Sequence, residues 1–168
     1  TSATQGNSAT PNQMGSDSNI SLTNDKTITV TTDLFQAQIS TVGGDLRRLD
    51  LLSHSSQNNA KEPYKLLVNN DDRVFIVQTG LISNSGIVLP NHHSIYSSDQ
   101  LNYVLQPGSD SITVNLKTSE NGIDVIKSYT FKHGSYVVDV SYQIANTTSN
   151  PLTGVSAYWS ILRDENAP

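Results

Sequence analysis

The chain has 168 residues, with ten Lys and Arg against fifteen Asp and Glu, which gives a formal net charge of -5. This balance argues against nucleic acid as a partner, because phosphate binding needs clustered basic residues and Arg47-Arg48 is the only adjacent basic pair. Anionic membrane surfaces are disfavoured for the same reason. The absence of cysteine excludes disulfides, thiolate metal sites and thiol nucleophiles.

The first 24 residues form a distinct polar segment. They are almost entirely Ser, Thr, Asn, Gln, Gly and Pro, and they offer too few apolar side chains to form a buried face. We therefore predict a flexible polar linker over 1–24 and a folded domain over 25–168. The sequence also has no long apolar run and no signal-peptide pattern, so we expect membrane attachment only through segments absent from this chain.

Strand-like alternation of apolar and polar residues begins directly after this segment. Ile28 and Val30 share one face of a predicted strand over 26–32, and Phe35, Ala37 and Ile39 share one face over 34–40. Further strands are predicted in an apolar stretch after the next turn and on both sides of an Asn-Asn-Asp-Asp turn, over 46–52, 65–68 and 73–77. The stretch 53–61 reads as a polar loop, and 80–102 reads as a long irregular excursion.

The last third of the chain has the clearest alternation. Strands are predicted over 111–117, 123–132, 136–144 and 152–162, separated by short polar turns, and we interpret them as an antiparallel meander. Tyr136, Tyr142, Tyr158 and Trp159 are assigned to the core as aromatic bulk. No stretch shows the spacing of an amphipathic helix, so the fold class is all-β, in the form of a sandwich.

Three glycines are predicted to hold structural turns. Gly43-Gly44 joins two apolar segments and can take a positive φ without a Cβ clash, and Gly134 follows His133 in a tight turn between two strands. We expect at least one residue of the Gly43-Gly44 pair to have a positive φ.

No pattern of catalytic or metal-binding residues stands out. His92-His93 is the only histidine cluster, and adjacent side chains on an extended segment point to opposite faces, which disfavours a shared metal. Glu62, Glu120 and Glu165 lie in turns or near the chain end, where no acid/base pair is expected. We therefore predict no catalytic residues, no cofactor and no metal site.

Two segments resemble the large periplasmic domain of the YidC membrane protein insertase family. One contains Thr32-Asp33, an alternating strand and Gly43-Gly44-Asp45. The other runs from Lys127-Ser-Tyr-Thr-Phe through Lys-His-Gly-Ser-Tyr to an alternating strand that ends at Asn146. The resemblance covers most of residues 26–162, and the order and spacing of the two segments make it fairly specific.

This resemblance implies a β-supersandwich of the galactose mutarotase-like type, apparently truncated here on its C-terminal side, so that 25–168 is an incomplete periplasmic β-sandwich domain. It implies a non-catalytic, chaperone-like role at the periplasmic side of the bacterial inner membrane. The implied partners are Sec translocon accessory subunits and nascent membrane proteins during insertion and folding. The groove in which insertion takes place belongs to membrane helices that this chain lacks.

Two alternatives stay open on the sequence. One is a sugar-binding or aldose-epimerase-like β-supersandwich protein, and the other is a purely structural surface module such as an adhesin domain. For a partner surface the sequence offers only Tyr96 and Tyr103, in and beside the irregular excursion. A truncated sandwich would leave a strand edge unpaired, so we also expect an edge-strand dimer with 152–162 or its neighbour at the contact.

Overall fold

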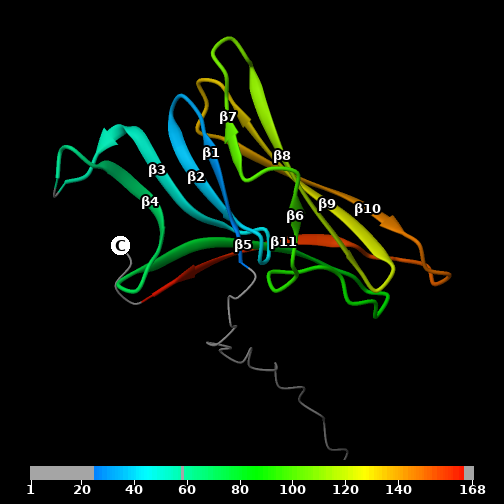
Figure 1. Cartoon of the computed structure of the whole chain (residues 1–168). Helices are drawn as coiled ribbons and strands as arrows, with labels where there is room; N and C mark the ends of the chain where they lie inside the picture. The colour runs from blue at the N-terminus through cyan, green and yellow to red at the C-terminus, as the bar shows by residue number, and fades with distance from the viewer. Residues whose placement is uncertain (1–24, 58, 165–168) are drawn as a thin grey trace, which may run out of the picture.

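The computed structural model describes residues 25–57 and 59–164, and they form two β-sheets packed into a sandwich (Figure 1). Within these residues there is no helix, and therefore none that could cross a membrane. The predicted all-β sandwich is thus confirmed. The predicted linker over 1–24 lies outside the described residues.

The larger sheet has seven strands in the order β11-β5-β4-β3-β2-β1-β7, and the smaller has four in the order β10-β9-β8-β6. The strands of the larger sheet, in chain order, are β1 (Thr27–Thr31), β2 (Phe35–Ser40), β3 (Leu46–Ser55), β4 (Pro63–Asn69), β5 (Val74–Ile82), β7 (Asn102–Val104) and β11 (Ser156–Arg163). Those of the smaller sheet are β6 (Ser97–Ser98), β8 (Ser111–Glu120), β9 (Ile123–Lys132) and β10 (Val138–Asn146).

The alternation read from the sequence sets which face of each strand is buried. In the β1–β2 pair, Ile28 lies opposite Ile39 and Val30 lies opposite Ala37, and all four side chains are fully buried. The polar residues between them face away from the smaller sheet. The inner faces of β8 and β9 supply the other half of the core, with Val114, Leu116, Ile123, Val125, Tyr129 and Phe131.

Tight turns join the three long strands of the smaller sheet. Asn121 and Gly122, with φ of 53° and 75°, connect β8 to β9. Gly134, with φ of 67°, lies in the turn between β9 and β10. Two successive positive φ values suit the twist of a hairpin, which is why an Asn-Gly pair occupies the first turn.

The predicted meander is wrong for its last strand. β11 does not pair with β10, but crosses to the larger sheet and pairs with β5 in antiparallel register from Ser156–Ile82 to Arg163–Phe75. The predicted excursion over 80–102 begins with the last residues of β5 and contains β6, and β7 then joins the edge of the larger sheet parallel to β1. Alternation identifies a strand, but it carries no information on the partner of that strand.

The core assignment of the aromatic residues also needs correction. Trp159 is 71% exposed and Tyr136 is 49% exposed, while Tyr142 and Tyr158 are only partly buried. The buried aromatic bulk comes from other rings, namely Phe35, Tyr96, Tyr103, Tyr129 and Phe131. The two exposed rings lie on or next to the edge strands, where no further strand covers them.

Candidate functional site

The two segments that carry the family resemblance meet in the interior of the sandwich. Lys127 on β9 is fully buried, and its Nζ donates hydrogen bonds to the carbonyl oxygens of Gly43 (3.0 Å) and Gly44 (2.7 Å). Tyr129 Oη donates a further bond to the Gly44 carbonyl at 2.6 Å. The double-glycine turn is therefore tied to β9, more than eighty residues away along the chain.

Asp45 completes this buried centre. Its Oδ1 lies 4.0 Å from Lys127 Nζ and accepts a hydrogen bond from the backbone N–H of Thr79 at 3.2 Å. Burial raises the pKa of Asp45 to about 6, against the lowering effect of the nearby Lys127 charge. Burial likewise lowers the pKa of Lys127 to about 8, although the Asp45 charge acts in the opposite direction.

Aromatic rings close the centre off from solvent. Lys127 Nζ lies 5.3 Å from the ring centroid of Tyr129, 5.8 Å from that of Tyr96 and 5.9 Å from that of Tyr142, within the range of cation–π attraction. Desolvation raises the pKa of all three phenols. Lys127 and Asp45 are both 0% exposed, and the hydrogen bonds of Lys127 hold the double-glycine turn against β9, so this centre stabilises the fold.

Tyr96 and Tyr103, named from the sequence as a partner surface, are both buried. Tyr96 is 2% exposed and contacts the Lys127 centre, and Tyr103 is 7% exposed with its hydroxyl 2.9 Å from Ser98 Oγ. A partner could reach these rings only after a rearrangement of the 95–104 region, so their role in binding stays a prediction. Gly43 and Gly44 have φ of 74° and 60°.

His92 and Glu120 each contact a hydroxyl group in the described structure. His92 Nδ1 lies 3.0 Å from Tyr158 Oη, and its ring lies 3.9 Å from that of His93. Burial lowers the pKa of His92, with a smaller contribution from His93. Glu120 accepts a hydrogen bond from Ser94 at 2.9 Å. In the described part of the chain, no group of three or more His, Asp or Glu side chains could hold a metal ion.

A second feature is an open end of the interior between the two edge strands β10 and β11. Tyr142 on β10 donates a hydrogen bond to Thr79 Oγ1 on β5 at 2.9 Å, so these two side chains face each other across the sandwich. Trp159 is the register partner of Thr79 and shares its face, and Ile161 follows two residues later. Val140 lies on the same face of β10 as Tyr142.

These apolar side chains are left uncovered. Trp159 is 71% exposed, Ile161 50% and Val140 41%, although they lie on the inward faces of the two sheets. We call Val140, Trp159 and Ile161 the open margin. The connection 147–155 crosses from one sheet to the other at the right-hand end of Figure 1. β11 has no charged side chain from Ser156 to Leu162.

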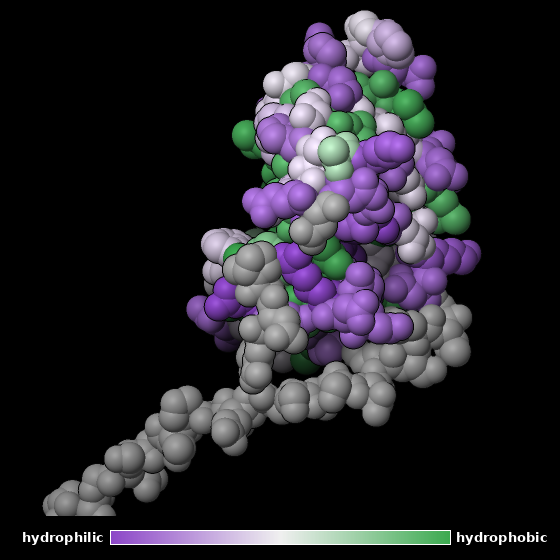
Figure 2. Space-filling model, turned by 90° about the vertical axis from the view of Figure 1, so that its left-hand side faces the viewer, coloured by the Kyte–Doolittle hydropathy of each residue, from purple (hydrophilic) through white to green (hydrophobic). Residues whose placement is uncertain are grey.

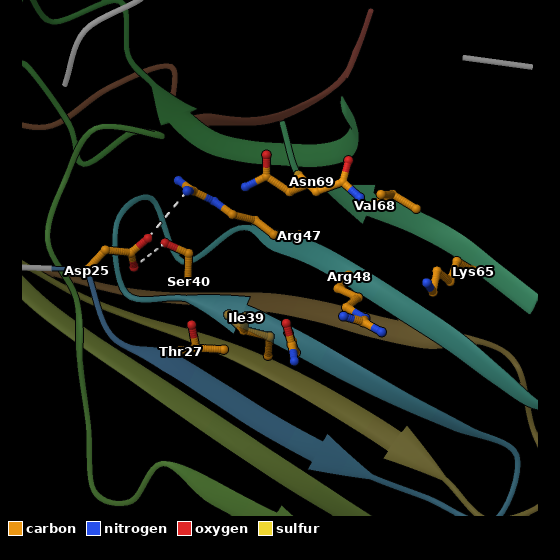
Figure 3. Close-up of a pocket in the computed structure, with 11 residues that line it drawn as sticks. Asp25, Thr27, Ile39, Ser40, Arg47, Arg48, Lys65, Val68 and Asn69 are labelled. Carbon is orange, nitrogen blue, oxygen red and sulfur yellow. Dashed lines mark hydrogen bonds and ion pairs between the residues drawn. The ribbon is translucent and has the colours of Figure 1, made fainter. Parts of the chain in front are cut away.

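A third feature lies on the opposite, outward face of the larger sheet, where polar side chains line a hollow of about 210 Å³. Figure 3 shows Arg47 directed toward Asp25 at one end, with Arg48 and Lys65 further along. The register pairs Gln38 with Arg48, which places their side chains on one face. The side of the molecule that carries β3 and β4 is mostly hydrophilic (Figure 2).

The fold and these surfaces define a class of protein: a β-sandwich module with a buried structural centre and exposed features that suit binding. The family model of the YidC periplasmic domain matches residues 27–168. The chain therefore belongs to the YidC periplasmic domain family, a family of non-enzymatic domains on the periplasmic side of the inner membrane.

Curated relatives agree with this family. The chain is 43% identical over 148 residues to the membrane protein insertase YidC of Laribacter hongkongensis, covering 88% of this chain and 26% of that protein. It is 40% identical over 169 residues to the YidC insertase of Nitrosomonas europaea, covering 97% of this chain and 25% of that protein. The chain thus spans about a quarter of the length of the curated relatives it matches.

The three features differ in how visible they are in the sequence. The glycine turn is visible from residue type alone. The burial of Lys127 is not predicted from the sequence. Its position between Val125 and Tyr129 on an alternating strand nevertheless indicates that its side chain points inward. The open margin and the outward hollow depend on which strands lie side by side, and no local pattern gives that information.

Proposed function

We propose that this domain is a docking module of a membrane protein insertase, and that the open margin holds extended apolar segments of nascent membrane proteins during insertion and folding. Docking to Sec translocon accessory subunits is the related role that family membership suggests. The single observation that supports the proposal best is the open margin, because it joins a strand edge that is unpaired in the described structure to inward-facing apolar side chains that stay 41% to 71% exposed.

The outer edge of β11 has the features of a surface that accepts an added strand. β11 is the last strand of its sheet in the described part of the chain, so backbone N–H and C=O groups along one side lack strand partners. An extended peptide can bind such an edge by main-chain hydrogen bonds, while its alternate side chains enter flanking pockets. Natural edges are commonly protected by charged residues, and β11 has none from Ser156 to Leu162.

Apolar surface is present on both faces of β11. Trp159 and Ile161 offer it on the inward face. On the other face, Tyr158 lines a mainly apolar hollow of about 530 Å³ together with Ile82 and Val88. A segment with apolar residues at successive positions would find contacts on both faces. This requirement fits a transmembrane segment before insertion better than it fits a soluble, alternating strand.

Site-specific photocrosslinking in the full-length insertase tests this proposal. A photoreactive residue at position 159 or 161 is expected to crosslink to a nascent membrane protein arrested during insertion. The matched control is position 113, which is also exposed but lies on β8 in the smaller sheet, whereas β11 belongs to the larger sheet. Crosslinks to Sec accessory subunits at the same positions would assign the margin to those subunits instead.

Equal yields at positions 113 and 159, or none at any of them, would contradict the proposal. The relatives contain about three quarters of their length outside the matched region, so other parts of the insertase are available to cover this margin. If position 159 forms intramolecular crosslinks and no others, then other parts of the insertase cover the open margin, and the proposal is wrong.

A further inference from the structure

A hollow of about 530 Å³ at the end of β5 has mainly apolar walls. The walls come from Leu81 and Ile82 of β5, from the 83–92 segment and from Tyr158 of β11. Among the described residues, no Asp, Glu, Lys or Arg side chain lines it. Ile82 is 56% exposed and Val88 is 64% exposed, so aliphatic surface is available inside the hollow. We call this site the β5 hollow.

The lining also contains one hydrogen-bonding pair, His92 and Tyr158. His92 Nδ1 lies 3.0 Å from Tyr158 Oη. Burial lowers the pKa of the His92 imidazole and raises the pKa of the Tyr158 phenol, so both groups are neutral at pH 7. A phenol hydroxyl has one donor and two acceptor sites, and the contact with a neutral imidazole therefore leaves Tyr158 able to form a further hydrogen bond.

The register between β11 and β5 connects this hollow to the outer edge of β11. Tyr158 is the register partner of Gly80, and a Cβ at Gly80 would lie 2.6 Å from Tyr158 Oη, so the phenol ring lies across β5 at this point. Ser156 is the register partner of Ile82, and the two side chains share the outward face of the sheet. Ser156 is small and exposed, so it leaves a path from the outer edge to Ile82.

The width of this path selects the side chains that can enter from the edge. Neighbouring strands lie about 4.8 Å apart, so a strand added to β11 would run about 10 Å from β5. A short or β-branched side chain ends well before that distance, whereas an aromatic ring that leans over Ser156 spans most of it. Lys and Arg are long enough, but the lining holds no carboxylate that would compensate a buried positive charge.

We propose that the β5 hollow binds the side chain of a Tyr or Trp residue, with the ring against Ile82 and Val88 and its polar group hydrogen-bonded to Tyr158 Oη. Tyr and Trp combine a large apolar surface with one polar group, and they are enriched at the ends of transmembrane segments. The ring would fix the register of a nascent membrane segment on β11, because only alternate positions of an added strand face the hollow. This role in insertion rests on the docking function proposed above, whereas binding of the ring itself does not.

Titration of the 168-residue chain with p-cresol, which has the ring and hydroxyl of a tyrosine side chain, tests the site by itself. The backbone ¹H–¹⁵N signals of Ile82 and Val88 are expected to shift saturably. Tyr158→Phe should weaken p-cresol binding by about fivefold, the usual effect of one lost hydrogen bond. The same variant should bind toluene as tightly as the unchanged chain, because toluene has no hydroxyl to lose a partner.

A second pair of variants tests the place of binding. Val88→Glu should abolish p-cresol binding, because it puts a charge inside the hollow. Val137→Glu is the matched control, since Val137 is 62% exposed, close to the 64% of Val88, but does not line the hollow. The proposal is wrong if the shifts do not saturate, if Tyr158→Phe binds p-cresol unchanged, or if the two Glu variants bind it equally well.

Crosslinking in the full-length insertase separates this proposal from the docking function. A photoreactive residue at position 88 should crosslink to an arrested nascent segment that carries one Tyr, and the yield should fall when that Tyr is replaced by Ala. Saturable p-cresol binding without any crosslinks from positions 159 and 161 would support the ring site and contradict the docking function. Crosslinks from 159 and 161 without p-cresol binding would do the reverse.

Discussion

Gly43 shows at the scale of one residue how backbone conformation and packing combine. Its φ of 74° is unfavourable for any residue with a Cβ, and a Cβ there would lie 2.5 Å from the His92 carbonyl oxygen and 2.6 Å from Asp45 Oδ2. Gly134 has a similar φ of 67°, but a Cβ there would meet no atom within 4 Å. Alanine substitutions at these two glycines therefore distinguish the free-energy cost of backbone strain from the added cost of a steric clash.

We predict that Gly134→Ala lowers the free energy of unfolding by about 1 kcal/mol, through the left-handed backbone alone. Gly43→Ala should lower it by about 2–4 kcal/mol, because the same strain is joined by a clash with backbone and with a buried carboxylate. Urea unfolding of both variants measures the difference. Equal losses would show that the Gly43 turn relaxes freely around a Cβ.

The buried pair Lys127–Asp45 gives a second prediction at this scale. Lys127→Met should destabilise the domain by about 3 kcal/mol, since it removes the donor to two buried carbonyl oxygens and leaves Asp45 without its cation. Combining it with Asp45→Asn should cost less than the sum of the two single losses, by at least about 1 kcal/mol. Additive losses in a double-mutant cycle would mean that the two side chains act independently.

The same pair predicts a pH dependence. The folded pKa of Asp45 is raised to about 6, so its contribution to stability is largest below about 4 and is lost as pH rises through about 6. The folded pKa of Lys127 is lowered to about 8, so stability rises again as pH increases from about 8 toward the usual lysine range. The contribution of these two groups to the stability of the domain should therefore be smallest between pH 6 and 8.

Urea unfolding across this pH range measures the effect, with the Asp45→Asn/Lys127→Met double variant as the reference. The difference between the two profiles isolates the pair from all other titrating groups. Parallel profiles would show that neither group changes its proton affinity on folding.

At the scale of elements, the hydrogen bond from Tyr142 to Thr79 is a direct side-chain link between the sheets close to the open margin. Tyr142→Phe keeps the ring but removes the donor, so we predict a loss of about 1 kcal/mol in the free energy of unfolding. Faster hydrogen exchange at the β10 backbone should accompany this loss, because in the described part of the chain β10 is an edge strand that pairs with β9 alone. If the variant loses the predicted stability but hydrogen exchange in β10 is unchanged, the hydrogen bond does not act by holding β10 in place.

At the scale of the whole molecule, the open margin predicts self-association of this chain. Two copies could pair their β11 edges about a twofold axis and cover Trp159 and Ile161, without charge repulsion along the strand. We expect a concentration-dependent dimer in analytical ultracentrifugation, with a blue shift in the fluorescence of Trp159, the only tryptophan in the chain.

Ile161→Lys should abolish the dimer and leave the fold intact, because it places a charge on a side chain that is already half exposed. Thr113→Lys on β8 is the control at an exposed position away from this edge. A dimer that survives Ile161→Lys, or a strict monomer at high concentration, would contradict the prediction.

The sequence alone determined the strands, their buried faces and the glycine turns, because alternation and backbone preference are local properties. It also carried the family resemblance, in the two segments around Gly43 and Lys127. The tertiary structure decided what depends on contacts between distant residues: the pairing of β11 with β5, the burial of Lys127 under Gly43 and Gly44, the open margin and the polar hollow on the outward face of the larger sheet. The physical reason is that alternation of period two fixes which way a side chain points, whereas the partner it meets is set by strand order and register.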